Sequence, residues 1–315
     1  MSEAIGDSKR PQPQLIVVGA ACRDIASGDP RGWRLGGGVT YSALTVARLG
    51  LSTAALVGVD DMAAGAEELD LLRRAGVDVR TVRLAHGPIF ENLERPDGRL
   101  QISHSPSDPV PIASLPTEWR RAPGWILAPV AAELPDEWAD VPGDEALVAV
   151  GWQSLLRVLE TDQPVRHLPP RSSPLARRAD LVGVSRDDLD QQVLLSELCA
   201  LLRPGATLAV TQGVRGGLVM EATPDGPTGM RRYPAVPTNR IVDATGAGDV
   251  FLAALAAARV EPRLVGGRIA HGHDVLLAAA AASLVLEASG LHGVPDRAAV
   301  RSRIRAAVQA RARTS

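Results

Sequence analysis

The residues best suited to chemistry lie in one short stretch, 243–249, which reads DATGAGD and precedes the apolar run 250–258. The glycines on either side of Ala247 allow a tight turn, so that successive backbone N–H groups can point outward where a helix begins and its dipole favours an anion. Asp249 would lie in the first helical turn, where a carboxylate can accept a proton from an alcohol. The stretch therefore predicts phosphoryl transfer to a hydroxyl, with the base and the anion hole in one segment.

A glycine pair followed by an acid can also be an ordinary turn in which the aspartate only caps a helix. The full string, however, resembles the signature of the ribokinase-like family, also called the PfkB carbohydrate kinases, which reads Asp-Thr-x-Gly-Ala-Gly-Asp and from which Ala244 departs. The resemblance implies that Asp249 is the catalytic base. It assigns the anion hole to Gly246, Ala247 and Gly248, and donor contacts to Asp243 and Thr245.

Two earlier segments extend this resemblance. Residues 35–50 resemble the family's glycine pair and first helix, residues 53–61 resemble its next strand and loop, and about 15–300 can be laid against the family. The resemblance implies a ribokinase-like three-layer α/β fold with a central, mostly parallel sheet and a small β-lid. It also implies a small-molecule kinase that uses ATP and Mg²⁺.

The acceptor side is predicted from the first strand, because Asp24 follows it at the carboxyl end, where α/β sheets place ligands. A loop-capping aspartate is the alternative. The resemblance assigns acceptor hydroxyls to Asp24, with Gly37 and Gly38 beside it. Ser42 takes a substrate position where many sugar kinases have Asn, and the change removes an amide able to bridge two hydroxyls.

The nucleotide side is predicted from residues 210–217, a turn after a β-like run that resembles the family's T-x-G-x-x-G loop. The resemblance assigns nucleotide contacts to Thr211, Gly213 and Gly216. Ala279 stands where many relatives have an Asn beside adenine, so an apolar adenine contact is expected. The family's N-x-x-E motif, which organises magnesium-bound water, appears as Ser-Arg-Asp-Asp, so Asp188 is the expected indirect metal residue.

Composition excludes several classes of protein. A chain of 315 residues with 45% hydrophobic content can bury a large core, and a net charge of −2 leaves no electrostatic footprint for nucleic acid or an anionic membrane. Two isolated cysteines and the lack of a recognisable signal peptide predict a cytoplasmic location. Lys9 is the only lysine and no G-x-x-x-x-G-K-[ST] loop occurs, so a P-loop kinase is excluded and cationic help must come from arginine or a metal.

Alternating strand-like and helix-like runs predict a layered α/β fold. Period-two stretches at 31–38 and 79–104 predict the lid, which in the family covers the acceptor and often forms a homodimer contact. Residues 1–13 are expected to be a disordered tail, and 14–315 a single kinase domain. The expected strands are 15–20, 54–59, 125–128, 146–150, 181–184, 208–211 and 217–221, and the first expected helices are 39–49 and 63–75.

The acceptor is predicted only as a class. Segments 90–94, 96–99, 128–133 and 152–157 resemble a branch of the family that includes plant inositol kinases and uncharacterised bacterial members, which favours a cyclic polyol or a sugar. A nucleoside kinase is the first alternative, for which Trp33 or Phe90 in the lid could supply a stacking surface. A non-catalytic sugar or nucleotide sensor on the same fold is the second, and the departures at positions 42, 188 and 279 fit it.

Overall fold

The computed structural model describes residues 12–314, apart from 96–97, 268 and 270–271. Most of the predicted tail, including Lys9, lies outside the described residues. A nine-stranded sheet runs through the molecule in the order β16-β15-β14-β13-β9-β8-β1-β4-β5. Its strands are β1 (Leu15–Ala20), β4 (Thr53–Val59), β5 (Asp78–Arg83), β8 (Gly124–Leu127), β9 (Leu147–Gly151), β13 (Leu181–Ser185), β14 (Thr207–Thr211), β15 (Gly217–Thr223) and β16 (Gly226–Tyr233).

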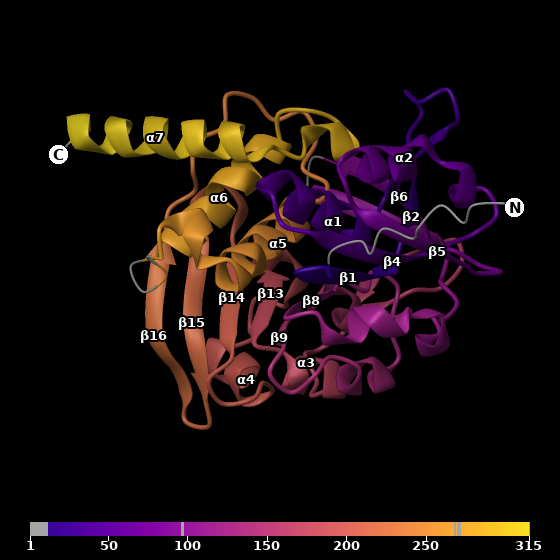
Figure 1. The fold of residues 1–315 in the computed structure, drawn as a ribbon, viewed down its shortest axis with the longest axis horizontal. Helices are drawn as coiled ribbons and strands as arrows, with labels where there is room; N and C mark the ends of the chain where they lie inside the picture. The colour runs from indigo at the N-terminus through magenta and orange to yellow at the C-terminus, as the bar shows by residue number, and fades with distance from the viewer. Residues whose placement is uncertain (1–11, 96–97, 268, 270–271, 315) are drawn as a thin grey trace, which may run out of the picture.

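Helices cover both faces of this sheet, as Figure 1 shows, so the fold has three layers. One face carries α1 (Gly38–Leu49), α2 (Glu67–Arg74), α5 (Ala247–Val260), α6 (His273–Val285) and α7 (Arg297–Thr314), and the other carries α3 (Pro174–Arg178) and α4 (Leu195–Ala200). In β1, Leu15 and Val17 enter the core under α1 and α5, whereas Ile16 and Val18 enter the core on the opposite face. Burial on both faces explains why β1 reads as a continuous apolar run.

The predicted mostly parallel sheet is confirmed, since every strand pair from β14 to β5 is parallel and only β15 and β16 pair in antiparallel fashion. One predicted boundary needs correction. The predicted lid segment 79–104 begins too early, because residues 79–83 belong to β5, the edge strand beside β4. An edge strand that is exposed on one side has the same period-two pattern as a lid strand, which is why the pattern did not separate the two.

A second sheet of five strands forms the lid, in the order β11-β7-β6-β2-β3. These strands are β2 (Cys22–Ile25), β3 (Trp33–Gly36), β6 (Ile89–Arg95), β7 (Gly98–Ser105) and β11 (Gln163–Pro164). β11 belongs to the connection between β9 and β13, which also forms a small hairpin of β10 (Arg157–Val158) and β12 (Arg166–His167). The connection therefore runs from the central sheet to the lid and back.

A histidine joins this connection to the lid. The His104 ring on β7 lies 2.7 Å from an Asp162 carboxylate oxygen and 3.1 Å from a Glu91 carboxylate oxygen on β6. Both contacts raise the pKa of His104 above its ordinary value, the Asp162 contact more strongly.

No helix within the described ranges is both long enough and apolar enough to cross a membrane.

Candidate active site

The glycine-rich turn opens α5 as the sequence predicts. Gly246 is its N-cap with a left-handed φ of 79°, and a β-carbon there would collide with the Tyr41 ring of α1. Asp243 shapes the turn by accepting hydrogen bonds from the backbone N–H of Thr245 at 2.9 Å and of Gly290 at 3.2 Å. Burial opposes ionisation of Asp243, but these hydrogen bonds outweigh it and hold its pKa below the ordinary value. The turn is thus fixed before any ligand binds.

Asp249 lies in the first turn of α5, with a partly buried side chain. A β-carbon on Gly38 would lie 2.9 Å from Asp249 Oδ1, so the carboxylate is packed against the beginning of α1. Burial raises the pKa of Asp249 to about 6; the positive charge of Arg157 opposes this rise, and the negative charge of Asp188 adds to it. Such a carboxylate is ionised at neutral pH and still basic enough to accept a proton.

Asp24 on β2 approaches the same glycine segment. Its Oδ2 occupies the space that a side chain at Gly36 would need, and the Cys22 thiol donates to its Oδ1 at 3.4 Å. Gly37 has a φ of 96° and is the N-cap of α1. Asp24 therefore packs against Gly36 and Asp249 packs against Gly38, so the two carboxylates lie at opposite ends of the turn 36–38.

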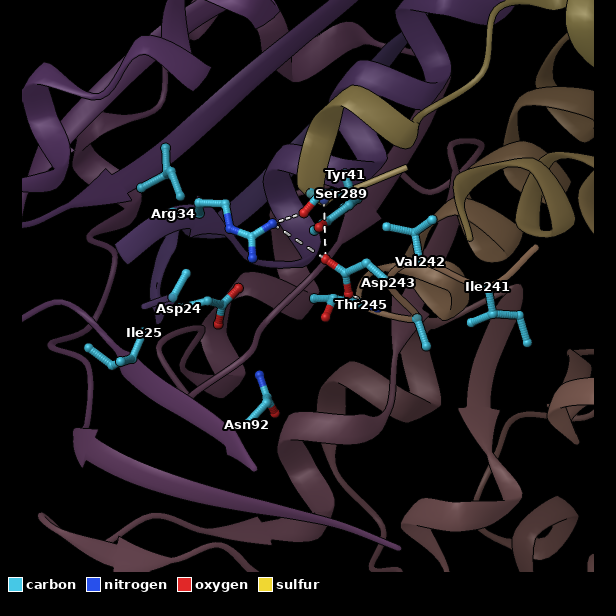
Figure 2. Close-up of a pocket in the computed structure, with 14 residues that line it drawn as sticks. Asp24, Ile25, Arg34, Tyr41, Asn92, Ile241, Val242, Asp243, Thr245 and Ser289 are labelled. Carbon is cyan, nitrogen blue, oxygen red and sulfur yellow. Dashed lines mark hydrogen bonds and ion pairs between the residues drawn. The ribbon is translucent and has the colours of Figure 1, made fainter. Parts of the chain in front are cut away.

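A cavity of about 410 Å³ opens between the lid and the loop before α5. Figure 2 shows Asp24, Arg34 and Asn92 on its lid side, facing Asp243 and Thr245. Arg34 Nη1 donates to Ser289 Oγ and lies 3.8 Å from Asp243 Oδ2. The lining mixes apolar residues with polar side chains that carry both signs of charge, and these side chains suit a ligand with several hydroxyl groups. Sequence analysis gave neither Arg34 nor Asn92 a role, although Asn92 lies in segment 90–94, which resembles a branch of the family.

A buried acid braces the floor of the site. Glu133 is fully buried and accepts hydrogen bonds from the backbone N–H groups of Ala20, Val130 and Ala131 at 2.8–3.1 Å. Burial raises the pKa of Glu133 against the effect of these donors. The hydrogen bonds of Glu133 connect the loop after β8 to the end of β1. The Ala128 carbonyl of that loop lies beside Gly38.

A further cluster lies beside Asp249. Asp188 accepts from Gln153 Nε2 at 3.0 and 3.2 Å and from Arg157 Nη2 at 3.1 Å. Sequence analysis singled out segment 152–157 without giving Arg157 a role. The sequence marked this segment only through its resemblance to the family branch, because no residue near it in the sequence connects it to Asp249.

The donors around Asp188 bear on its predicted metal role. Both of its carboxylate oxygens already accept hydrogen bonds, one of them from a guanidinium, whose charge repels a cation. Within the described ranges, no three or more His, Cys, Asp or Glu side chains group closely enough to hold a metal ion. These contacts argue against direct magnesium coordination by Asp188, and its expected indirect role, through a water molecule, stays a prediction.

The predicted nucleotide residues lie further along the sheet edge. Thr211 ends β14, and Gly213 and Gly216 flank a short 3-10 turn after it, both with positive φ. Gly216 is required by packing, because a β-carbon would collide with the Tyr233 carbonyl oxygen. Ala279 is buried within α6.

The altered acceptor residue, Ser42, does not line the cavity. It is 1% exposed on α1, and its Oγ has no hydrogen-bond partner within the part of the chain that is described.

The two aromatic residues proposed for nucleoside stacking are covered. Trp33 is 7% exposed, with the guanidinium of Arg31 at 4.8 Å from its ring centroid and that of Arg23 at 5.7 Å. Phe90 is 3% exposed and packs with Cys22 beneath the lid. Neither ring lines the cavity.

Comparisons with known proteins agree with this geometry. The family described as pfkB family carbohydrate kinase matches residues 178–297, which include the turn and Asp249. No curated protein matches the chain in sequence. A pyrophosphate-dependent kinase in the ribokinase family, solved with a pyrophosphate analog and myo-inositol, is 18% identical with a TM-score of 0.70, covering 91% of this chain and 99% of its own.

Two further solved structures are similar. Ribokinase from Arabidopsis thaliana, complexed with ribose and ATP, is 20% identical with a TM-score of 0.65, and the alignment covers 93% of this chain and 99% of that one. A nucleoside kinase from Methanocaldococcus jannaschii is 16% identical with a TM-score of 0.65, covering 94% and 99%. At these identities the likeness shows the fold.

The fold and the family match together define a class. The structure has the ribokinase-like fold, and the predicted resemblance to the PfkB carbohydrate kinases is confirmed. The predicted enzyme class, a phosphotransferase with an alcohol group as acceptor, is confirmed with it.

Proposed function

We propose that the protein is an ATP-dependent kinase that transfers the γ-phosphoryl group to a hydroxyl of a sugar or cyclic polyol. One observation carries the proposal: a fixed left-handed turn at Gly246 opens a 14-residue helix, and a carboxylate with a pKa of about 6 lies in its first turn. Such a helix end binds anions, and such a carboxylate is a suitable base.

In the proposed mechanism the acceptor binds in the cavity, with its hydroxyls on Asp24 and Asn92 and with Gly37 and Gly38 beneath it. Asp249 accepts the proton of the attacking hydroxyl as the new bond to phosphorus forms. The backbone N–H groups of residues 246–248 stabilise the charge on the transferring phosphoryl oxygens. The turn needs no rearrangement to do this, because Asp243 already holds it.

The donor is proposed to lie along Thr211, Gly213 and Gly216, with adenine against Ala279. Magnesium is proposed only as the counter-ion that enters with the donor phosphates, because Asp188 is engaged by protein donors. Pyrophosphate is the donor to test against ATP, since the similar structure solved with myo-inositol is that of a pyrophosphate-dependent kinase.

A sugar or polyol is preferred to a nucleoside because Asp24, Arg34 and Asn92 offer hydrogen-bonding groups in the cavity. The rings of Trp33 and Phe90 are covered, so neither offers a stacking surface. A sensor without turnover is the other alternative, and the raised pKa of Asp249 argues for a base rather than a remnant.

Two further predictions belong to this proposal. A cytoplasmic location is favoured because both cysteines are free and buried rather than paired. Pairing of two copies through the lid stays a prediction, which sedimentation equilibrium would measure.

The experiment measures ADP release from Mg-ATP, and phosphate release from pyrophosphate, against pentoses, hexoses, inositols and nucleosides. Acceptor-dependent release by the wild type and its loss in Asp249→Asn would support the proposal. Normal turnover by Asp249→Asn, or nucleotide binding without turnover on any acceptor, would contradict it. A nucleoside that outpaced every polyol would replace the acceptor class.

A second variant tests the anion hole separately. A β-carbon on Gly248 meets nothing within 4 Å, so Gly248→Ala should fold normally. If a phosphoryl group lies over this turn, the added methyl group should lower kcat by ~10-fold or more, because it crowds the bound anion. Full activity in Gly248→Ala would place the phosphoryl group elsewhere.

A further inference from the structure

We propose that Arg157 is a catalytic residue of this centre, whose guanidinium binds the transferring phosphoryl group while it is held by Asp188. The inference rests on the proposed function, because it concerns the charge of the phosphoryl group in that reaction. The cation near Asp249 then belongs to the chain itself, and it is paired with Asp188, the acid predicted to organise magnesium-bound water.

The first support is the position of Arg157. It follows β9, which lies at the middle of the sheet beside β13, the strand that leads to Asp188. Leu159 and Val165 of the same connection pack against the cluster of Cys22 and Phe90 beneath the lid. The segment is therefore wedged between the lid and the catalytic carboxylate.

The second support is the hydrogen bonding of the guanidinium. The side chains of Arg157 and Asp188 are each 9% exposed, and Arg157 Nη2 donates to Asp188 at 3.1 Å. Arg157 Nε is buried and has no hydrogen-bond partner among the residues that the structure describes. A guanidinium presents several N–H groups in a rigid fork, so one can hold Asp188 while others bind an anion. The missing partner is an acceptor, such as a phosphate oxygen.

The third support is charge. Ionised Asp188 and Asp249 repel each other and would repel a phosphorylated donor. The only lysine in the sequence is Lys9, so arginine is the cation that the chain can offer. Arg34 pairs with Asp243 across the cavity, and Arg23 pairs with Asp60 at 2.7 Å. Arg157 is the arginine whose charge acts on Asp249.

A purely structural ion pair is the competing explanation. Buried ion pairs contribute little net stability, because desolvation offsets the attraction between the charges. A structural pair also gives no reason for a donor that is left without a partner at this depth. The geometry fits a guanidinium that is held ready for an incoming anion.

The test compares the wild type with Asp188→Asn and with the double variant Arg157→Gln/Asp188→Asn. The double variant removes both charges together, so no unpaired buried carboxylate is left to destabilise the fold. Binding of inorganic tripolyphosphate is measured by calorimetry, and kcat is measured on the best acceptor. Thermal melting checks that each variant is folded.

We expect the double variant to have a kcat ~100-fold below that of Asp188→Asn, as for the loss of a group that stabilises transition-state charge. It should also bind tripolyphosphate ~10-fold or more weakly, because a charge-assisted contact is lost. Equal binding and equal kcat in the two variants would overturn the inference. So would an Asp188→Asn variant as impaired as the double variant, because the acid would then carry the function.

If the wild type binds tripolyphosphate through Arg157 but phosphorylates no acceptor, the proposed function fails while the phosphate-binding role stands. If the double variant does not fold, Arg157→Lys replaces it, since lysine keeps the charge but loses the fork. That variant should lose ~10-fold in kcat and in tripolyphosphate binding, and unchanged values would overturn the inference.

Discussion

Asp249→Asn should stabilise the protein while abolishing turnover, and the gain should depend on pH. Burial raises the pKa of Asp249 from its ordinary value of 3.8 to about 6 in the folded chain. Between these values the folded state binds a proton that the unfolded state releases, so the wild type loses stability as the pH rises from 3.8 through about 6. Asparagine has nearly the same shape and carries no charge, so its stability lacks this dependence.

The size of the effect follows from the two pKa values. Ionisation of Asp249 costs the folded wild type about 1.5 kcal/mol at pH 5 and about 3 kcal/mol at pH 8 relative to an uncharged side chain. Asp249→Asn should therefore be more stable than the wild type by about these amounts, with a larger gain at pH 8. Most substitutions destabilise, so a gain is itself diagnostic.

The assay is urea unfolding of both proteins at pH 5 and at pH 8, followed by fluorescence and circular dichroism so that two-state behaviour is checked. Gly65→Ala is a suitable control, because a β-carbon there meets nothing within 4 Å and no charge changes. An Asp249→Asn variant that is no more stable than the wild type at pH 8, or equally stabilised at both pH values, would refute the raised pKa of Asp249.

Two further predictions concern the glycine segment and the lid. Gly38→Ala should lower kcat much more than stability, because the new β-carbon would lie 2.9 Å from Asp249 Oδ1; steady-state kinetics and thermal melting check this, and activity equal to that of Gly65→Ala would contradict it. His104→Ala should cost more stability at pH 6 than at pH 9, because a raised pKa means that the contribution of the protonated ring is lost as pH rises; thermal melts at the two pH values measure this, and equal losses would contradict it.

Local features of the site were predictable from the sequence. The turn at 243–249 carries its own geometry, since Asp243 bonds to Thr245 two residues away and Gly246 takes the left-handed conformation that glycine favours. Strands β1 and β4 were equally clear, because burial on both faces leaves continuous apolar runs. The features that failed depend on tertiary context. β5 and the lid strands share a period-two pattern, and only pairing partners distinguish them.

Arg157 illustrates the other limit. Its segment is distinctive in sequence, but its charge matters only because the connection after β9 folds back beneath the lid and reaches the beginning of α5. Arg34 and Asn92 likewise come to line one cavity only when β3 and β6 join one sheet over the loop before α5. Roles that arise from such pairings cannot be read from residue types along the chain.

Three glycines make this contrast physical. Gly36, Gly38 and Gly246 are each required because another site residue occupies the space of a side chain: the Asp24 carboxylate, the Asp249 carboxylate and the Tyr41 ring. The positions of Gly36 and Gly38 in the sequence therefore reflect where the Asp24 and Asp249 carboxylates lie in the fold. The lid residues that line the cavity leave no such pattern in the sequence, because they contribute side chains to the cavity rather than leaving space for another residue. The reaction class can consequently be predicted from the glycines and acids of this chain, because their spacing follows from the packing of the turn.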